Sequence, residues 1–409
     1  MKTRIASAGT GKTTYLITRI IELAQEGTPL RRVAAVTYTR RAANDLQLKL
    51  RAALQELHDT GAWLNHTLKP EHKPTIETAL RELDGSNIGT IHAFLANLLR
   101  LVAPTIMLDP DFTVIGESDA ISIYREEAAT HAYLTNTPIP DRTMSRLEQL
   151  FQQRSLATTF HTNHDSDQEL LNLHQTLMRR YATRLDNRAL APADLELKAV
   201  EAAKHDTVLQ RWRERVQQVI VDEAQDLNPI QGAFLERLEQ SGIQVEAVGD
   251  PKQSIYAFRH ADLDTFRRII NASEQSQPLN TTYRHSRVLT RFLNGLTNNM
   301  GQNDRGFTSS EAPTVTPARE EQGSLSVHWV ESRDRTGIDK LRAHEAELLA
   351  HSLKRLHQQH GVAYDDMAIL MRSRASQPHV QAALERHDIP TVIVQGRNYY
   401  RQSEIRDLV

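Results

Sequence analysis

The sequence predicts an α/β fold with a parallel sheet, and three observations indicate it. Short β-branched apolar runs recur, each followed by a polar or glycine turn, at residues 4–6, 33–36, 219–221 and 245–248. Such continuous runs are typical of strands that are buried on both faces of a sheet, with helices between them. Behind the first run, Ile17, Ile20, Ile21 and Ala24 fall on one face of a helix. The length of 409 residues exceeds what one hydrophobic core usually serves, so more than one domain is expected.

The composition excludes several classes of protein. No apolar run approaches the ~20 residues that span a bilayer, and the chain begins with Met-Lys-Thr-Arg before a glycine-rich loop, so we expect a cytoplasmic protein without a membrane partner. The lack of cysteine excludes disulfides and cysteine-ligated zinc or iron–sulfur clusters, and the 18 histidines show no metal-ligand spacing, so a metal site formed by the protein alone is not expected. A net charge of −2 provides no global attraction to nucleic acid, so DNA binding would require a local groove lined by Lys and Arg.

Two regions depart from this first strand–helix pattern. Residues from about 92 to 194 form polar, helical segments with few β-branched runs, which predicts a helical insertion. A new α/β pattern begins at Pro278 and is interrupted by the polar segment 301–322. Its later part predicts a strand at residues 368–371 and a helix at residues 379–386.

A phosphate-binding loop follows the first predicted strand. Residues 6–13, Ala-Ser-Ala-Gly-Thr-Gly-Lys-Thr, fit the P-loop pattern and precede an amphipathic helix, as the mechanism requires. The two glycines let backbone amides turn toward phosphates, Lys12 reaches the β and γ oxygens, and the Thr13 hydroxyl is a ligand for Mg²⁺. The loop therefore predicts a nucleoside triphosphate site with these contacts: Ala8, Gly9, Thr10, Gly11, Lys12, Thr13 and Thr14.

Two adjacent carboxylates end the apolar strand at residues 219–221. Asp222 is placed to hold Mg²⁺, directly or through water, and Glu223 can polarise the water that attacks the γ-phosphate. An Asp-Glu pair after a strand is most often only a solvated turn or helix start. Its coupling to the P-loop is what makes the pair a predicted hydrolysis site for Lys12, Thr13, Asp222 and Glu223.

The motifs around these residues resemble those of UvrD/Rep-type superfamily 1 DNA helicases. Residues 222–226 and 248–259 resemble motifs II and III, residues 36–43 motif Ia, residues 89–94 a later DNA-contacting motif of the same domain, and residues 279–284 motif IV. The motifs occur in the family's order, and the wording of the P-loop is closest to the helicase-nuclease branch of RecB/AddA type. The resemblance implies an ATP-dependent motor, with ATP and Mg²⁺ as cofactors.

The family's architecture implies three regions in this chain. A RecA-like P-loop NTPase domain, 1A, would comprise residues 1–92 and 195–277, a helical insertion domain, 1B, residues 93–194, and a partial second RecA-like domain, 2A, residues 278–409. The resemblance also implies that Gln253 senses the γ-phosphate and couples it to DNA, that Arg284 contacts this phosphate across the cleft, and that Tyr283 stacks on adenine. Without the motif, Tyr283 and Arg284 would be interpreted as a half-exposed pair at a domain surface.

Aromatic and imidazole rings just after predicted strand ends suggest a track for single-stranded DNA. Bases stack on such rings for roughly 1–3 kcal/mol each without sequence preference. Neighbouring hydroxyl and guanidinium groups would hold phosphates or brace the loops that do, although aromatic residues after strands usually belong to the core. The predicted DNA contacts are Thr37, Tyr38, Thr39, Arg40, His92, Phe94, Tyr256, Phe258 and Arg259. A basic cluster at Arg179, Arg180, Arg184 and Arg188 would either meet duplex DNA or form a solvated helix face.

Three features depart from the family pattern. The first strand begins at residue 2, without the upstream glutamine that reads adenine, and Thr14 stands where an arginine often follows the P-loop threonine. Motifs V and VI do not occur, and residues 388–409 resemble the point where family chains continue into the rest of domain 2A. We therefore expect this chain to bind ATP and single-stranded DNA but to hydrolyse ATP slowly by itself.

Three functions remain open at this stage. The leading one is an ATP-driven motor that moves 3′ to 5′ along single-stranded DNA and unwinds duplex at junctions in repair or recombination. The second is an ATP-responsive DNA-binding module without translocation, and the third is the motor subunit of a helicase-nuclease complex, with a nuclease or a helicase-loading protein as partner.

Overall fold

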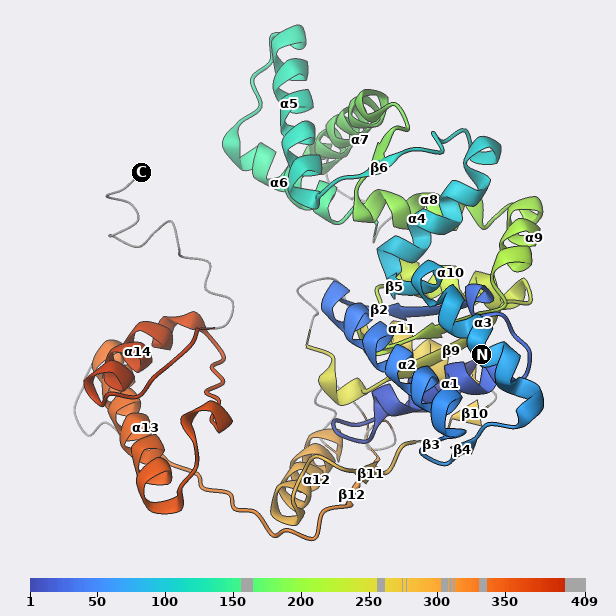
Figure 1. The fold of residues 1–409 in the computed structure, drawn as a ribbon. Coiled ribbons are helices and arrows are strands. Elements are labelled where there is room, and N and C mark those ends of the chain that lie inside the picture. Colours follow the sequence, from blue (N-terminus) through green and yellow to red (C-terminus); the bar gives the residue numbers. More distant parts are fainter. Residues whose placement is uncertain are drawn as a thin grey trace. The chain divides into compact units, whose positions relative to one another are not determined.

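The structure is a computed structural model, and it describes residues 1–155, 165–255, 262–273, 275–276, 278–302, 308, 311, 313–330 and 337–393. The chain divides into two compact units, Met1–Ser324 and Leu325–Val409, each of which is described by itself below (Figure 1). Within the described residues, the structure contains no helix with the length and apolar character needed to cross a membrane.

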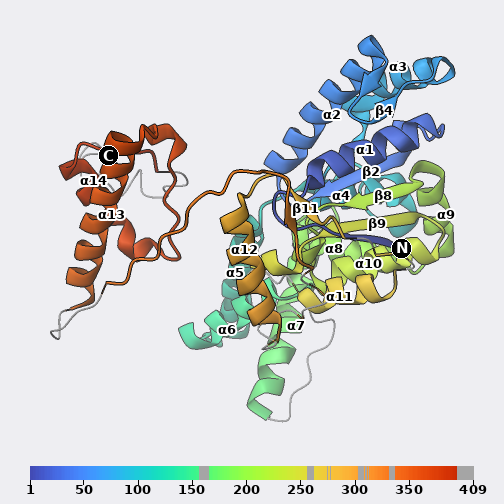
Figure 2. The same ribbon diagram turned by 90° about the horizontal axis from the view of Figure 1, so that it is seen from below.

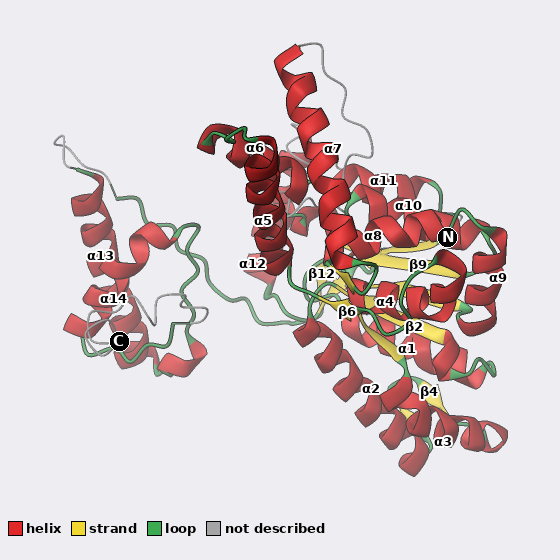
Figure 3. Ribbon diagram, turned by 90° about the horizontal axis from the view of Figure 1, so that it is seen from above, coloured by secondary structure: helices red, strands yellow, loops and turns green. Residues whose placement is uncertain are grey.

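A six-stranded parallel sheet organises the first unit. Its strand order is β10-β1-β9-β8-β2-β5, and all neighbouring strands pair in parallel. Figure 3 shows the strands in yellow. The strands are β1 (Lys2–Ile5), β2 (Val33–Thr37), β5 (Asn87–Thr90), β8 (Gln218–Val221), β9 (Gln244–Gly249) and β10 (Gln275–Ser276). The four strands predicted from apolar runs correspond to β1, β2, β8 and β9, which confirms the α/β fold with a parallel sheet.

Alternate residues of each strand enter separate cores on the two faces of the sheet. In β8, Val219 and Val221 pack on one face, whereas Ile220 packs on the other. Helices cover both faces, as the continuous apolar runs predicted (Figure 2). One face is covered by α1 (Lys12–Gln25), α2 (Arg40–Thr60) and α3 (Lys73–Glu82). The other is covered by α4 (Ile91–Val102), α8 (Pro192–Ala202), α9 (Asp206–Arg215), α10 (Pro229–Gln240) and α11 (Leu263–Asn271). A small hairpin of β3 (Ala62–Trp63) and β4 (His66–Thr67) follows α2.

The predicted helical insertion is mainly helical in its described residues and has a core of its own. It contains α5 (Glu117–Thr135), α6 (Asp141–Gln152) and α7 (Asp165–Leu185), whose buried side chains include Tyr124, Phe151 and Tyr181. A short parallel pair, β6 (Thr113–Val114) with β7 (Ala189–Leu190), joins its two ends. Near this junction the buried Arg154 donates hydrogen bonds to Asp194 of α8 and to Glu117 at the start of α5.

The segment after Pro278 runs beside the strand that leads to the P-loop. Leu279 N–H donates to Ile5 O at 2.9 Å, and β11 (Thr281–Thr282) pairs with β12 (Thr316–Pro317). Helix α12 (Arg287–Gln302) follows β11. This stretch belongs to the first compact unit, whereas domain 2A is predicted to begin at Pro278; that boundary stays a prediction.

The second unit consists mainly of two packed helices in its described residues. These are α13 (Ile338–His360) and α14 (Gln377–Arg386), which share a small core with Ile389. Helix α14 confirms the helix predicted at residues 379–386. The strand predicted at 368–371 is wrong, because these residues form neither a helix nor a strand, and Leu370 is 95% exposed. A short apolar run becomes a strand only where a neighbouring strand pairs with it.

Candidate nucleotide and DNA site

The P-loop connects the end of β1 to the first turn of α1. Thr10 closes the loop, because its N–H and its hydroxyl both donate to Ser7 O, at 3.2 and 2.8 Å. Gly9 and Gly11 have φ values of 76° and 81°, a region that favours glycine. At Gly9 a side chain would also collide with Cβ of Arg284 and approach the Thr282 hydroxyl to 2.9 Å. Both backbone conformation and close approach therefore require glycine at position 9.

Lys12 joins the P-loop to the acidic end of β8. Its Nζ lies 3.6 Å from Asp222 Oδ1 and forms a closer ion pair with Glu223 Oε2. Burial raises the pKa of Asp222, and the charge of Glu223 acts in the same direction, against the opposing effect of Lys12. The predicted association of Lys12, Asp222 and Glu223 is therefore present in the structure.

The residue at the centre of this group has an unusual backbone. Glu223 has φ 53°, the left-handed region that few residues other than glycine adopt. Its N–H donates to Asp222 Oδ1 at 2.9 Å, which supports the turn. Such strain persists only where surrounding contacts impose it, and it clusters at functional sites. The turn directs Glu223 to Lys12.

A chain of hydrogen bonds continues from Glu223 to Gln253. Gln225 donates to Glu223 Oε2 at 2.9 Å, and its own Oε1 accepts from the N–H of Asp250 at 2.9 Å. Asp250 in turn accepts from Gln253 Nε2 at 2.8 Å. Lys252 pairs with Asp250 and donates to the Ser7 hydroxyl at 2.8 Å, which links this chain to the P-loop.

The site predictions did not include Gln225, Asp250 or Lys252. The available signal was their position, since polar residues directly after neighbouring parallel strands meet at one edge of a sheet. Gln225 follows β8 and Asp250 follows β9, and β8 pairs with β9. A buried network at this edge could therefore have been inferred from the strand predictions.

Tyr283 and Arg284 lie beside the P-loop. Tyr283 N–H donates to Gly9 O at 2.8 Å, and the Thr282 hydroxyl donates to Ala8 O at 3.3 Å. The Tyr283 side chain is 61% exposed. Backbone contacts thus hold this segment against the loop while its ring remains open to solvent.

The oxygen donors around the P-loop suit a magnesium–nucleotide complex. Thr13 follows Lys12 in the first turn of α1, and Lys12 is the residue that contacts Asp222. A hydroxyl and a carboxylate are the hard oxygen ligands that Mg²⁺ takes together with phosphate oxygens and water. The residues present therefore fit this cofactor.

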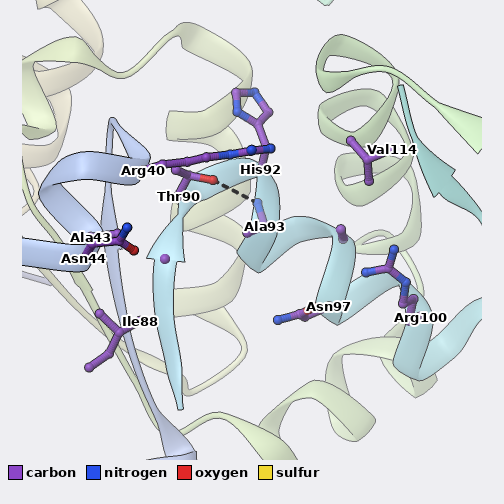
Figure 4. Close-up of a pocket in the computed structure, with 12 residues that line it drawn as sticks. Arg40, Ala43, Asn44, Ile88, Thr90, His92, Ala93, Asn97, Arg100 and Val114 are labelled. Carbon is purple, nitrogen blue, oxygen red and sulfur yellow. Dashed lines mark hydrogen bonds between the residues drawn. The ribbon is translucent and has the colours of Figure 1, made fainter. Parts of the chain in front are cut away.

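A pocket of about 370 Å³ lies between α2, β5 and α4, and two of the predicted DNA contacts line it (Figure 4). Figure 4 shows Arg40 at the start of α2, His92 in the first turn of α4 and Arg100 farther along α4. The Thr90 hydroxyl accepts a hydrogen bond from the N–H of Ala93 and caps α4. The pocket brings together Arg40 and His92 of the predicted set, and it adds Asn44, Thr90, Asn97 and Arg100.

The remaining predicted DNA contacts have different positions. Thr37 is buried and donates to Thr39 O at 3.0 Å, while the Thr39 hydroxyl accepts from Ala42 N–H and caps α2. These two threonines brace the loop that contains the half-buried Tyr38. Phe94 is only 3% exposed and packs in the core that α4 forms with the sheet. Its predicted place on the DNA surface is therefore wrong. Tyr256, Phe258 and Arg259 lie outside the described residues.

Comparisons with known proteins agree with these motifs. A family model described as the UvrD/REP helicase N-terminal domain matches residues 4–274, and one described as the UvrD-like helicase C-terminal domain matches residues 278–409. The chain belongs to the UvrD/REP helicase family. The ATP-dependent DNA helicase PcrA of Staphylococcus aureus is 24% identical to this UvrD/REP family chain over 99% of the chain and 50% of its own length. DNA helicase II of Haemophilus influenzae is 25% identical over 98% of the chain and 50% of its own length. The chain spans about half the length of these curated relatives.

The basic cluster of this UvrD/REP family chain is partly neutralised within the insertion. Arg180 pairs with Glu127 at 3.0 Å, and Arg184 pairs with Glu126 at 2.6 Å. Arg188 lies 3.4 Å from Asp186. These ion pairs favour the solvated helix face over the alternative in which the arginines meet duplex DNA.

Proposed function

We propose that this chain is the ATP-binding and single-stranded-DNA-binding part of a DNA helicase motor. The observation that carries the proposal is the convergence of Lys12, Asp222 and Glu223 at one sheet edge, with a hydrogen-bonded chain from Glu223 to Gln253. Membership of the UvrD/REP helicase family supports ATP-driven unwinding, as do the names of its relatives, an ATP-dependent DNA helicase and a DNA helicase. We further propose 3′ to 5′ movement and a role in DNA repair or recombination.

At the nucleotide edge, each residue has a defined task in this proposal. The amides of residues 8–13 bind the phosphates, and Lys12 exchanges the carboxylate of Glu223 for β- and γ-phosphate oxygens. Thr13 and Asp222 would hold Mg²⁺, which when bound supplies charge neutralisation on the phosphate oxygens. Glu223, released from Lys12, orients and polarises the attacking water. Tyr283 stacks on the base, Arg284 binds the γ-phosphate, and Gln253 registers its presence.

At the DNA surface, the proposal assigns binding to the pocket and the adjoining loops. Arg40 lies at the first turn of α2, where the helix N-terminus also favours an anion. Tyr38 and His92 would stack on bases or bind phosphates beside it. Tyr256, Phe258 and Arg259, which lie outside the described residues, would contact DNA by the resemblance. Stacking and phosphate contacts of this kind accept any base, which suits a motor on single-stranded DNA.

The test is nucleotide binding by Lys12→Ala, measured by isothermal titration with Mg²⁺ and adenylyl imidodiphosphate. We expect the variant to lose detectable binding, because it loses the cation that contacts the β- and γ-phosphates. Lys49→Ala, at an exposed position of α2, is the matched control and should bind like the wild type. Unchanged affinity in Lys12→Ala would overturn the assignment of the nucleotide site.

A further inference from the structure

A buried carboxylate connects the DNA pocket to the loop that carries the hydrolytic residues. Glu196 of α8 is only 5% exposed. Its Oε1 accepts hydrogen bonds from His92 Nε2 at 3.1 Å and from Gln231 Nε2 at 2.6 Å. Its Oε2 accepts one from Asn228 Nδ2 at 3.0 Å. One carboxylate thus joins the wall of the pocket to the first turn of α10.

The two ends of this contact belong to different functional regions. His92 lies in the first turn of α4 and lines the pocket. Asn228 is the N-cap of α10 and forms a reciprocal capping box with Gln231. The short 3-10 turn Ala224–Asp226 separates this cap from Glu223. A shift of the α10 cap would therefore also move the turn that contains Glu223.

The same stretch also contacts residues on both sides of segment 256–261, which includes the end of motif III. The Ser254 hydroxyl donates to Gln225 O at 3.4 Å, and Asp262 N–H donates to Leu227 O at 3.0 Å. Residues 225–227 thus contact the residues on either side of segment 256–261. Glu196 holds the helix cap that directly follows this turn.

The charge of Glu196 is well supported in this position. Burial alone would raise the pKa of Glu196, but the hydrogen bonds from His92, Asn228 and Gln231 outweigh it and leave the pKa below its usual range. A buried charge is costly when any of its partners is withdrawn. A change in the contact with His92 therefore alters the hydrogen bonds that Glu196 accepts from Asn228 and Gln231, because the buried carboxylate has little solvent to replace the lost partner.

We propose that Glu196 is a positioning residue that couples DNA binding at His92 to the geometry of the nucleotide site. DNA that contacts His92 changes the hydrogen bond to Glu196, which shifts the balance of its bonds to Asn228 and Gln231 and moves the start of α10. Nucleotide binding acts in reverse through the turn at residues 222–227, because coupling between two sites is reciprocal. This inference rests on the proposed function, since it requires both ligands to bind.

The experiment measures the coupling factor between the two ligands. The dissociation constant of adenylyl imidodiphosphate with Mg²⁺ is determined with and without saturating oligothymidylate, using the full chain. We expect a factor of about 5–150 for the wild type and a factor close to one for Glu196→Gln, whose amide cannot accept from all three donors. The matched control is Glu201→Gln, which makes the same change at an exposed position of α8 and should keep the wild-type factor.

The outcomes separate this inference from the proposed function. Failure of the wild type to bind either ligand would refute the proposed function, whereas tight binding of both ligands without coupling would refute only the role of Glu196. A purely structural role would lower the melting temperature and leave the coupling factor intact, which would also refute it. If Glu196→Gln does not fold, His92→Phe keeps a ring at the more exposed end of the contact but has no N–H to donate to Glu196, and retention of the wild-type factor there would overturn the inference.

Discussion

The nucleotide edge and the DNA pocket differ in how their side chains are held. At the nucleotide edge, the half-buried side chains of Lys12, Glu223 and Gln253 are held by ion pairs and hydrogen bonds to other residues of the protein. In the pocket, Arg40 is exposed, and His92 is tied inward to Glu196. A fixed geometry suits a reaction whose transition state is always the same. An adaptable cationic surface suits a polymer whose bases vary.

Glu223→Gln should have the largest effect, a loss of ATP hydrolysis at the nucleotide edge. The amide oxygen can still accept from Gln225, so the network and ATP binding should be retained, but the group can no longer act as a base. We expect single-turnover hydrolysis to slow by about 10²- to 10⁴-fold. Glu56→Gln, at an exposed position of α2, is the control and should hydrolyse ATP at the wild-type rate. Undiminished hydrolysis by Glu223→Gln would remove this residue from the reaction.

Phe94 tests the inner border of the DNA surface. Because Phe94 is buried in the core, Phe94→Ala should lower the free energy of unfolding by about 3–5 kcal/mol. Phe94→Leu preserves most of the apolar volume and should cost less than about 1.5 kcal/mol, with unchanged affinity for single-stranded DNA. Denaturant unfolding and fluorescence anisotropy measure the two effects. A large loss of DNA affinity in a stable Phe94→Leu variant would show that the ring does contact DNA.

Gly9→Ala would disturb the P-loop without altering any charge. The variant combines positive φ, which costs about 1–3 kcal/mol, with the collision against Arg284. Gly27→Ala is a matched control, because Gly27 has φ 90° but no atom within 4 Å of the added carbon. We expect both variants to melt earlier and only Gly9→Ala to lose nucleotide affinity. Equal nucleotide affinity in the two variants would mean that the close approach to Arg284 is unimportant.

Residues whose role follows from local pattern could be predicted from the sequence. The apolar runs at β1, β2, β8 and β9 were sufficient to locate these strands, and the P-loop spacing identified Lys12. The prediction that Phe94 contacts DNA was wrong, because an aromatic residue after a strand has the same local sequence pattern in a core as in a groove. Counting along α4 would have revealed the difference, since Phe94 shares its buried face with Ile91, Leu95 and Leu98.

Contacts between distant segments could not be obtained in this way. Glu196 is separated in sequence from both His92 and Asn228, and only packing of α8 between α4 and α10 brings the three together. Histidine spacing likewise did not reveal that Glu347, His351 and His387 meet between α13 and α14. The Glu347 carboxylate there is already paired with His387 and Arg386, at 2.8 and 2.6 Å, so we assign no metal to it.

Arg40→Ala should have the smallest of these effects and should be confined to the DNA pocket. An exposed arginine that contacts a phosphate contributes mainly through counterion release, so its removal should reduce the slope of log K against log salt by about 0.7 for single-stranded DNA. The loss should be the same for oligothymidylate and oligoadenylate, because a phosphate contact carries no base information. Arg41→Ala provides a stringent control, since Arg41 is the next residue of α2 and is also exposed but does not line the pocket. Nucleotide affinity without DNA should be unchanged in both variants. If Arg41→Ala reduced the salt slope as much as Arg40→Ala, the DNA would be bound by the general charge of the helix end rather than by the pocket.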